Sequence, residues 1–160
     1  MSTPKVGILM GSVSDLGVMQ EASKILDDFE VPYDIRVLSA HRSPSLTTDF
    51  ARDAEGRGIQ VLIAGAGAAA HLAGVLAAHT ILPVIGVPID SSPLKGLDAL
   101  LATVQMPGGV PVSSMAIGKA GARNAGLVAV QILSRSDTGL QEKLRAYKAA
   151  QQKKIESIQL

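Results

Sequence analysis

The stretch KVGILMGSVSDLGVMQEASKILDDF, residues 5–29, joins three kinds of local sequence. An apolar run at 5–10 is followed by the small residues Gly11 and Ser12, and then by a longer segment, 13–29, with apolar residues at helical spacing. A short, continuous apolar run that ends in a small-residue turn is typical of a strand covered on both faces. The stretch therefore predicts a strand, a tight turn and an amphipathic helix, in that order.

The same order of segments recurs along the rest of the chain. Further apolar runs cover residues 34–38, 59–64, 83–89 and 112–117, and the helical segments that follow them cover 46–56, 72–79, 94–103 and 123–134. Strands that alternate with helices at this spacing indicate β–α–β units and a parallel sheet. Right-handed crossovers then predict a flavodoxin-like α/β fold, a doubly wound three-layer sandwich with about five strands. The chain is too short for a (β/α) barrel, which needs roughly 250 residues.

The length of the chain indicates a single α/β domain, residues 1–160, and apolar residues at loosely helical spacing indicate a helical tail at about 138–160. Hydrophobic residues make up 47% of the 160 residues and charged residues 18%, which suits a globular protein with a sizeable core. The net charge of +1 gives no basic excess for a nucleic-acid partner. The chain has no cysteine, which excludes disulfides and thiolate chemistry and agrees with a cytoplasmic protein.

Residues 59–89 contain no Asp, Glu, Lys or Arg, and by length alone this stretch could span a bilayer. Glycines, prolines and two histidines divide it into short pieces with turns of their own. We therefore predict buried strands and a helix here, and no membrane partner.

Three predicted strands are followed by turns with distinctive side chains: GSVSD (11–15), SAHRSP (39–44) and GAGAAAH (65–71). In open α/β sheets the ligand crevice lies beyond the carboxyl ends of the strands, where these turns meet. Each turn also leads into a helix N-terminus, whose free N–H groups favour anions. We expect a ligand site to be built from these three turns.

In SAHRSP, Ser43 suits a helix N-cap and Pro44 suits the first helical position, which places His41 and Arg42 at the crevice. Arg42 can form a fork of hydrogen bonds to a phosphate or carboxylate. His41 can give and take a proton at neutral pH. From their position in the sequence alone, a surface loop in which His41 and Arg42 are neighbours by chance is nearly as good an interpretation as a functional site.

In GSVSD, Ser12 and Asp15 have the spacing of a capping box, which is a structural role. The same cap exposes N–H groups that can bind phosphate, and a carboxylate there suits a pair of sugar hydroxyls. Both roles can hold.

GAGAAAH fits the dinucleotide pattern G-x-G-x-x-A, with Asp90 about twenty residues further on. This pattern would lie on the third strand rather than the first, and no chain remains for a substrate domain. Small residues for close strand–helix packing explain the stretch at least as well. His71 and His79 are too far apart for a metal pair on one helix, so we expect no metal site.

Six stretches in one order carry a resemblance: MGSVSD, VLSAHRSP, IAGAGAAAHLAG, LPVIGVPI, VQMPGGVPV and AIGKAGARNAG. Across nearly its whole length, the sequence resembles the 5-(carboxyamino)imidazole ribonucleotide mutase (PurE) family of de novo purine biosynthesis. The resemblance implies an isomerase without cofactor, metal or ATP. Its reaction moves a carboxyl group from the exocyclic nitrogen of an aminoimidazole ribonucleotide to ring carbon 4. It also implies a cytoplasmic homo-octamer with active sites between subunits.

Residue by residue, the resemblance implies that His41 is the catalytic proton shuttle. The positions it implies for substrate binding are Ser12, Ser14, Asp15, Ser39 and Arg42, together with Gly67, Ala69 and His71 of a loop around the imidazole and the migrating carboxyl group. Ala68 and Ala73 stand where the family usually has Gly and Pro, and Ala68 would be strained if its φ were positive. Two alternatives stay open: direct carboxylation of aminoimidazole ribonucleotide by carbon dioxide, and a dinucleotide-binding module.

Overall fold

The computed structural model describes residues 3–159, so residues 1, 2 and 160 of the predicted single domain lie outside the described residues. The strands are β1 (Val6–Met10), β2 (Tyr33–Val37), β3 (Val61–Gly67), β4 (Val84–Ile89) and β5 (Ser113–Ser114). The helices are α1 (Leu16–Asp28), α2 (Pro44–Asp53), α3 (Leu72–Ala77), α4 (Leu97–Val104), α5 (Lys119–Leu133) and α6 (Thr138–Glu156). Two 3₁₀ turns, η1 (Val13–Asp15) and η2 (Ser134–Ser136), precede α1 and α6.

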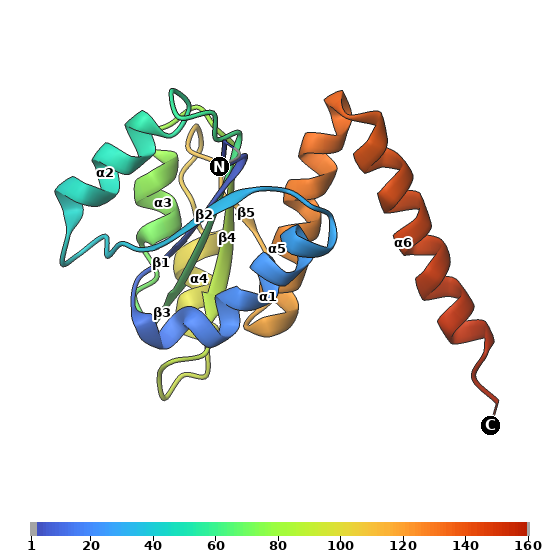
Figure 1. Cartoon of the computed structure of the whole chain (residues 1–160). Coiled ribbons are helices and arrows are strands. Elements are labelled where there is room, and N and C mark those ends of the chain that lie inside the picture. The colour runs from blue at the N-terminus through green and yellow to red at the C-terminus, as the bar shows by residue number, and fades with distance from the viewer. Residues whose placement is uncertain (1–2, 160) are drawn as a thin grey trace.

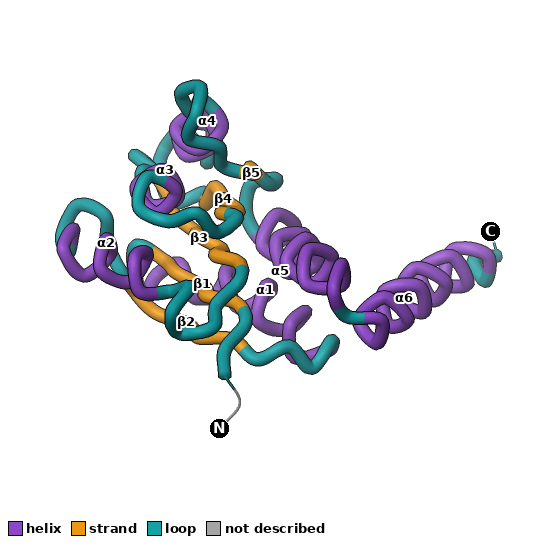
Figure 2. Tube along the Cα trace, turned by 90° about the horizontal axis from the view of Figure 1, so that it is seen from above, coloured by secondary structure: helices purple, strands orange, loops and turns teal. Residues whose placement is uncertain are grey.

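The sheet has the order β2-β1-β3-β4-β5, and every pairing in it is parallel. Helices α1 and α5 cover one face, while α2, α3 and α4 lie on the other (Figure 2). The predicted doubly wound, flavodoxin-like sandwich is confirmed. All five residues of β1 and all six of β4 are buried, as continuous apolar runs predict for strands covered on both faces.

Small residues bring α5 close to its neighbours. Ala122, Ala125 and Ala129 are fully buried on the face that packs against the sheet and α1. A Cβ on Gly126 would lie 2.9 Å from the backbone oxygen of Ala22, so the crossing with α1 requires glycine at this position. The core therefore reaches close packing with few rings, in agreement with an aromatic content of 2%.

The helix predicted in the C-terminal tail is present as α6, and it extends away from the sheet (Figure 1). Its first half is attached to the domain. Lys143 donates to the Phe29 carbonyl at 3.3 Å and pairs with Glu30, and Tyr147 packs on Phe29. No residue of α6 is buried, so its distal half has no partner within the described chain.

No helix within residues 3–159 is long and apolar enough to cross a membrane. The uncharged stretch 59–89 instead supplies β3, α3 and β4, the centre of the sheet and its cover.

Glu21 connects α1 to α5, because its carboxylate accepts hydrogen bonds from Lys24 and Arg123, each at 2.7 Å. The bonds from Lys24 and then Arg123 lower the pKa of Glu21 from its ordinary 4.5 to about 2. A lowered folded-state pKa stabilises the fold above the unfolded value, and this stabilisation is lost as the pH falls from about 4.5 towards 2. We expect Glu21→Gln to lower the free energy of unfolding at pH 7, by a difference that shrinks across that window.

Urea unfolding of both proteins at a series of pH values measures this difference. Asp49→Asn is the matched control, because the Asp49–Arg52 pair is 3.8 Å long and exposed on both sides, and such a pair contributes little. A Glu21→Gln difference that stays constant from pH 7 to pH 2 would contradict the prediction.

Candidate active site

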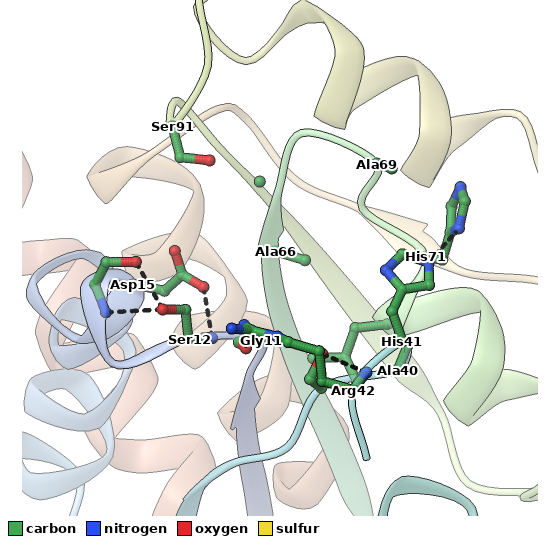
Figure 3. A pocket seen from close by; sticks show the side chains of 14 residues that line it. Gly11, Ser12, Asp15, Ala40, His41, Arg42, Ala66, Ala69, His71 and Ser91 are labelled. Carbon is green, nitrogen blue, oxygen red and sulfur yellow. Dashed lines mark hydrogen bonds between the residues drawn. The ribbon is translucent and has the colours of Figure 1, made fainter. Parts of the chain in front are cut away.

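The turns that follow β1, β2 and β3 meet at the carboxyl edge of the sheet, as predicted, and they surround a cavity of about 340 Å³ (Figure 3). Every residue predicted for the site lines this cavity: Ser12, Ser14, Asp15, Ser39, His41, Arg42, Gly67, Ala69 and His71. Gly11, Ala40 and Ala66 of the same three turns also line it, and the two lining residues outside these turns are Leu72 and Ser91. Chain segments up to eighty residues apart thus share one pocket.

The first turn forms the predicted capping box at the start of η1. The Ser12 N–H donates to the Asp15 carboxylate at 3.1 Å, and the Ser12 hydroxyl accepts from the N–H and the hydroxyl of Ser14, at 3.3 and 2.9 Å. Asp15 is only 5% exposed. Burial raises the pKa of Asp15 above its ordinary 3.8, against the Ser12 N–H and the charge of Arg42, which lower it. A buried carboxyl group with a perturbed pKa in a pocket is typical of a functional position.

The second turn is closed by serines. Ser43 precedes α2, and Pro44 is the first residue of the helix, as predicted. The Ser43 hydroxyl does not cap the helix, however. It donates to the Ser39 carbonyl at 3.0 Å and accepts from the Ser39 N–H at 2.9 Å, so both hydrogen bonds of this hydroxyl close the turn. The turn therefore presents His41 and Arg42 at a fixed place beside the pocket.

Arg42 ties the second turn to the first. One of its terminal nitrogens donates to the Gly11 carbonyl at 2.9 Å, and its Nε donates to the Ser39 hydroxyl at 3.4 Å. A guanidinium has five N–H donors, so others stay available for an anionic ligand. The charge of Arg42 also acts on Asp15, which places a cation and a carboxylate in one pocket.

His41 and His71 join the second turn to the third. The His41 Nε2 lies 2.8 Å from the His71 Nδ1, and the rings meet edge to face with centroids 4.8 Å apart. One nitrogen must donate and the other accept, so this contact holds one proton between the two rings. The pair can give or take a proton at the pocket, and the sequence placed both residues there without predicting their contact.

The third turn begins later than the sequence suggested, because β3 continues through Gly67. Gly65 and Gly67 pair with Val87 and Ile89 of β4. A dinucleotide fingerprint needs these glycines in the turn after the strand, where the backbone meets a pyrophosphate. Asp90 does not line the pocket. This geometry does not favour the dinucleotide interpretation.

Ala68 has a φ of +51°, so the condition under which we expected strain at this residue is met. A residue with a Cβ in this left-handed region is strained by about 1–2 kcal/mol. Glycine removes this strain, but its greater freedom in the unfolded state offsets part of the gain. We expect Ala68→Gly to raise the free energy of unfolding by about 0.5–1 kcal/mol. Urea unfolding at one fixed protein concentration measures this change.

Ala69→Gly is the matched control, because Ala69 is the next residue and its φ is not in the left-handed region. We expect this control to lose about 0.5–1 kcal/mol instead. If both variants lost stability equally, the strain assigned to Ala68 would be wrong.

Ser91 was missed, although a signal for it exists. It follows β4 by two residues, so the rule that located the other turns also places it at the carboxyl edge of the sheet.

Within residues 3–159, no group of three or more His, Asp or Glu side chains is placed to share a metal ion.

The fold and the pocket together define a class: a flavodoxin-like α/β enzyme with a histidine pair, a buried carboxyl group and an arginine in one site. The family model described as AIR carboxylase matches residues 5–154, and the chain belongs to this family. N5-carboxyaminoimidazole ribonucleotide mutase from Pyrococcus abyssi is 59% identical over 145 residues, covering 91% of this chain and 82% of that protein. The mutase from Bacillus subtilis is 59% identical over 141 residues, covering 88% and 87%.

The solved structures agree with the fold. The crystal structure of Treponema denticola PurE superposes with a TM-score of 0.86 at 27% identity, covering 95% of this chain and 94% of that one. The whole sandwich, including most of the C-terminal region, is therefore shared with that structure.

Proposed function

We propose that this protein is an N5-carboxyaminoimidazole ribonucleotide mutase of de novo purine biosynthesis, an isomerase that moves a carboxyl group from nitrogen to ring carbon 4. The observation that carries the proposal is the hydrogen-bonded pair of His41 and His71 in the pocket that also holds Arg42 and Asp15. Relatives at 51–59% identity that bear this name support it.

Each part of a ribonucleotide finds a chemical match among the lining residues. Arg42, with the hydroxyls of Ser12, Ser14 and Ser39 near it, suits the phosphate, because guanidinium and hydroxyl groups donate to anionic oxygens. Asp15 suits the two ribose hydroxyls, which can donate to its carboxylate. The short side chain of Ala69 leaves room for a small imidazole beside the histidines.

The proposed chemistry needs two proton transfers by one histidine. His41 donates a proton to the exocyclic nitrogen as the bond from nitrogen to the carboxyl carbon breaks, and the electron pair of that bond stays on nitrogen. Carbon dioxide and the free amine result. Carbon 4 then attacks the carbon dioxide, and His41 removes the proton from carbon 4, which restores the aromatic ring and the starting state of the histidine.

We also propose the homo-octamer that the resemblance implies. Leu97, Leu101 and Val104 on one face of α4 are each about half exposed, at 54%, 49% and 50%. Residues 99–118, which continue from α4 through β5, contain no charged side chain. Such a surface suits contact with a second copy of the chain. Sedimentation velocity tests this assembly, and a monomer at micromolar concentration would contradict it. The cytoplasmic location stays a prediction.

An ultraviolet assay of the purified protein tests the reaction. The protein is given either the carboxyamino ribonucleotide, or aminoimidazole ribonucleotide with bicarbonate, without ATP or added metal. Rapid formation of the 4-carboxylate from the first substrate would support the mutase. Efficient use of the second alone would identify a direct carboxylase, the reaction in the family description. No conversion of either would overturn the proposal.

A further inference from the structure

Ser91 fills the place of a side chain that Gly67 lacks. Gly67 pairs with Ile89 at the end of β4, and Ser91 follows two residues later. A Cβ on Gly67 would lie 1.7 Å from the Ser91 hydroxyl oxygen and 2.8 Å from its Cβ. Gly67 does not have a left-handed φ, so it is required for space rather than for backbone conformation. The absent side chain thus admits a hydroxyl group to the wall of the pocket.

The Ser91 hydroxyl is uncommitted within residues 3–159. Ser12, Ser14, Ser39 and Ser92 each use their hydroxyl in a hydrogen bond within the chain, and Ser92 donates to Asp98 at 2.7 Å. No hydrogen bond among the described residues involves that of Ser91. It lies across the pocket from His41 and Arg42, and it points into the pocket (Figure 3).

The third turn supplies no side-chain donor next to Ser91. Arg42 lies on the opposite side of the pocket, and the lining residues Ala66, Gly67 and Ala69 carry no polar side chain. The N–H groups of Ala70 and His71 are already used, each donating within the turn at 2.9 Å. An anionic group that lies between Ser91 and the histidine pair could therefore accept a hydrogen bond from the Ser91 hydroxyl on one side and from a histidine on the other.

We propose that Ser91 donates a hydrogen bond to the migrating carboxyl group of the ligand, while Arg42 holds the phosphate at the other side. The inference rests on the proposed function, since it needs a ligand that is anionic at both ends. It adds to the site a residue that distinguishes a carboxylated ribonucleotide from one without the carboxyl group.

Calorimetric titration of two ligands tests the inference: the 4-carboxylate product, and aminoimidazole ribonucleotide, which lacks the carboxyl group. We expect Ser91→Ala to weaken binding of the product about tenfold, because a hydrogen bond to a charged group is lost. Binding of the carboxyl-free ligand should stay within twofold. Ser45→Ala is the matched control, since Ser45 is an exposed residue of α2 that does not line the pocket.

An equal loss for both ligands would place Ser91 against the ribose or the phosphate and overturn the inference. Unchanged binding of both ligands would overturn it as well. A wild-type protein that binds neither ligand would overturn the proposed function, and the inference with it, so the two failures are distinguishable.

Discussion

Replacement of His41 by Asn is expected to lower the rate of carboxyl migration by about 10²- to 10⁴-fold, the usual effect of losing a general acid–base group. Asparagine is the sharpest substitution here, because its amide can still form a hydrogen bond near the His71 Nδ1, 2.8 Å from the native ring nitrogen. It cannot exchange a proton at neutral pH. Ribonucleotide binding should therefore change by no more than a few-fold, which calorimetric titration beside the ultraviolet assay would measure.

The third histidine of the chain provides a matched control. His79 follows α3 and does not line the pocket, so His79→Asn should keep the wild-type rate. A His41→Asn protein that retained full activity would refute the catalytic assignment. Equal losses of binding and turnover would make His41 a binding residue instead.

The alternation of strands and helices was predictable because the central strands β1, β3 and β4 are covered on both faces and are therefore continuously apolar in sequence. The end of β3 was not. Gly65 and Gly67 have the composition of a turn, yet they continue the strand because β4 pairs with them. That pairing joins residues more than twenty positions apart, and no local pattern reports it. Helix α5 begins at Lys119, four residues before the helical segment that the sequence predicted at 123–134.

The site was predictable at the level of turns and less so at the level of contacts. Chain order and the carboxyl-edge rule brought the three turns together. The partners of Ser43 and the contact between His41 and His71 depend on side-chain positions in separate turns. Ser91 was missed because its neighbourhood, SSP, has the composition of a plain turn and its significance arises from Gly67. From the sequence, Ala68 could be called strained only if its φ were positive. The structure shows that its φ is +51°.

Replacement of Arg42 by Ala is expected to weaken the binding of phosphorylated ligands by about 10- to 100-fold, the range for losing hydrogen bonds from a charged donor. The dephosphorylated nucleoside should lose much less affinity. This comparison is needed because Arg42 also donates to Gly11 and Ser39, and its removal loosens the join between the first two turns. A looser join between the turns would lower the affinity for both ligands alike, whereas the loss of a phosphate contact would lower the affinity for the phosphorylated ligand alone.

Two further variants complete the argument for Arg42. Arg42→Lys keeps the charge without the planar fork, so it should recover part of the affinity for phosphate but not the paired bonds to Gly11 and Ser39. Arg52→Ala removes an exposed arginine outside the pocket and should bind both ligands as the wild type does. If Arg42→Ala bound phosphorylated ligands with unchanged affinity, the phosphate would have to lie elsewhere. The hydroxyls of Ser12 and Ser14 would then be candidate donors to the phosphate. Asp15 in the same turn could not take this role, because a carboxylate repels a phosphate.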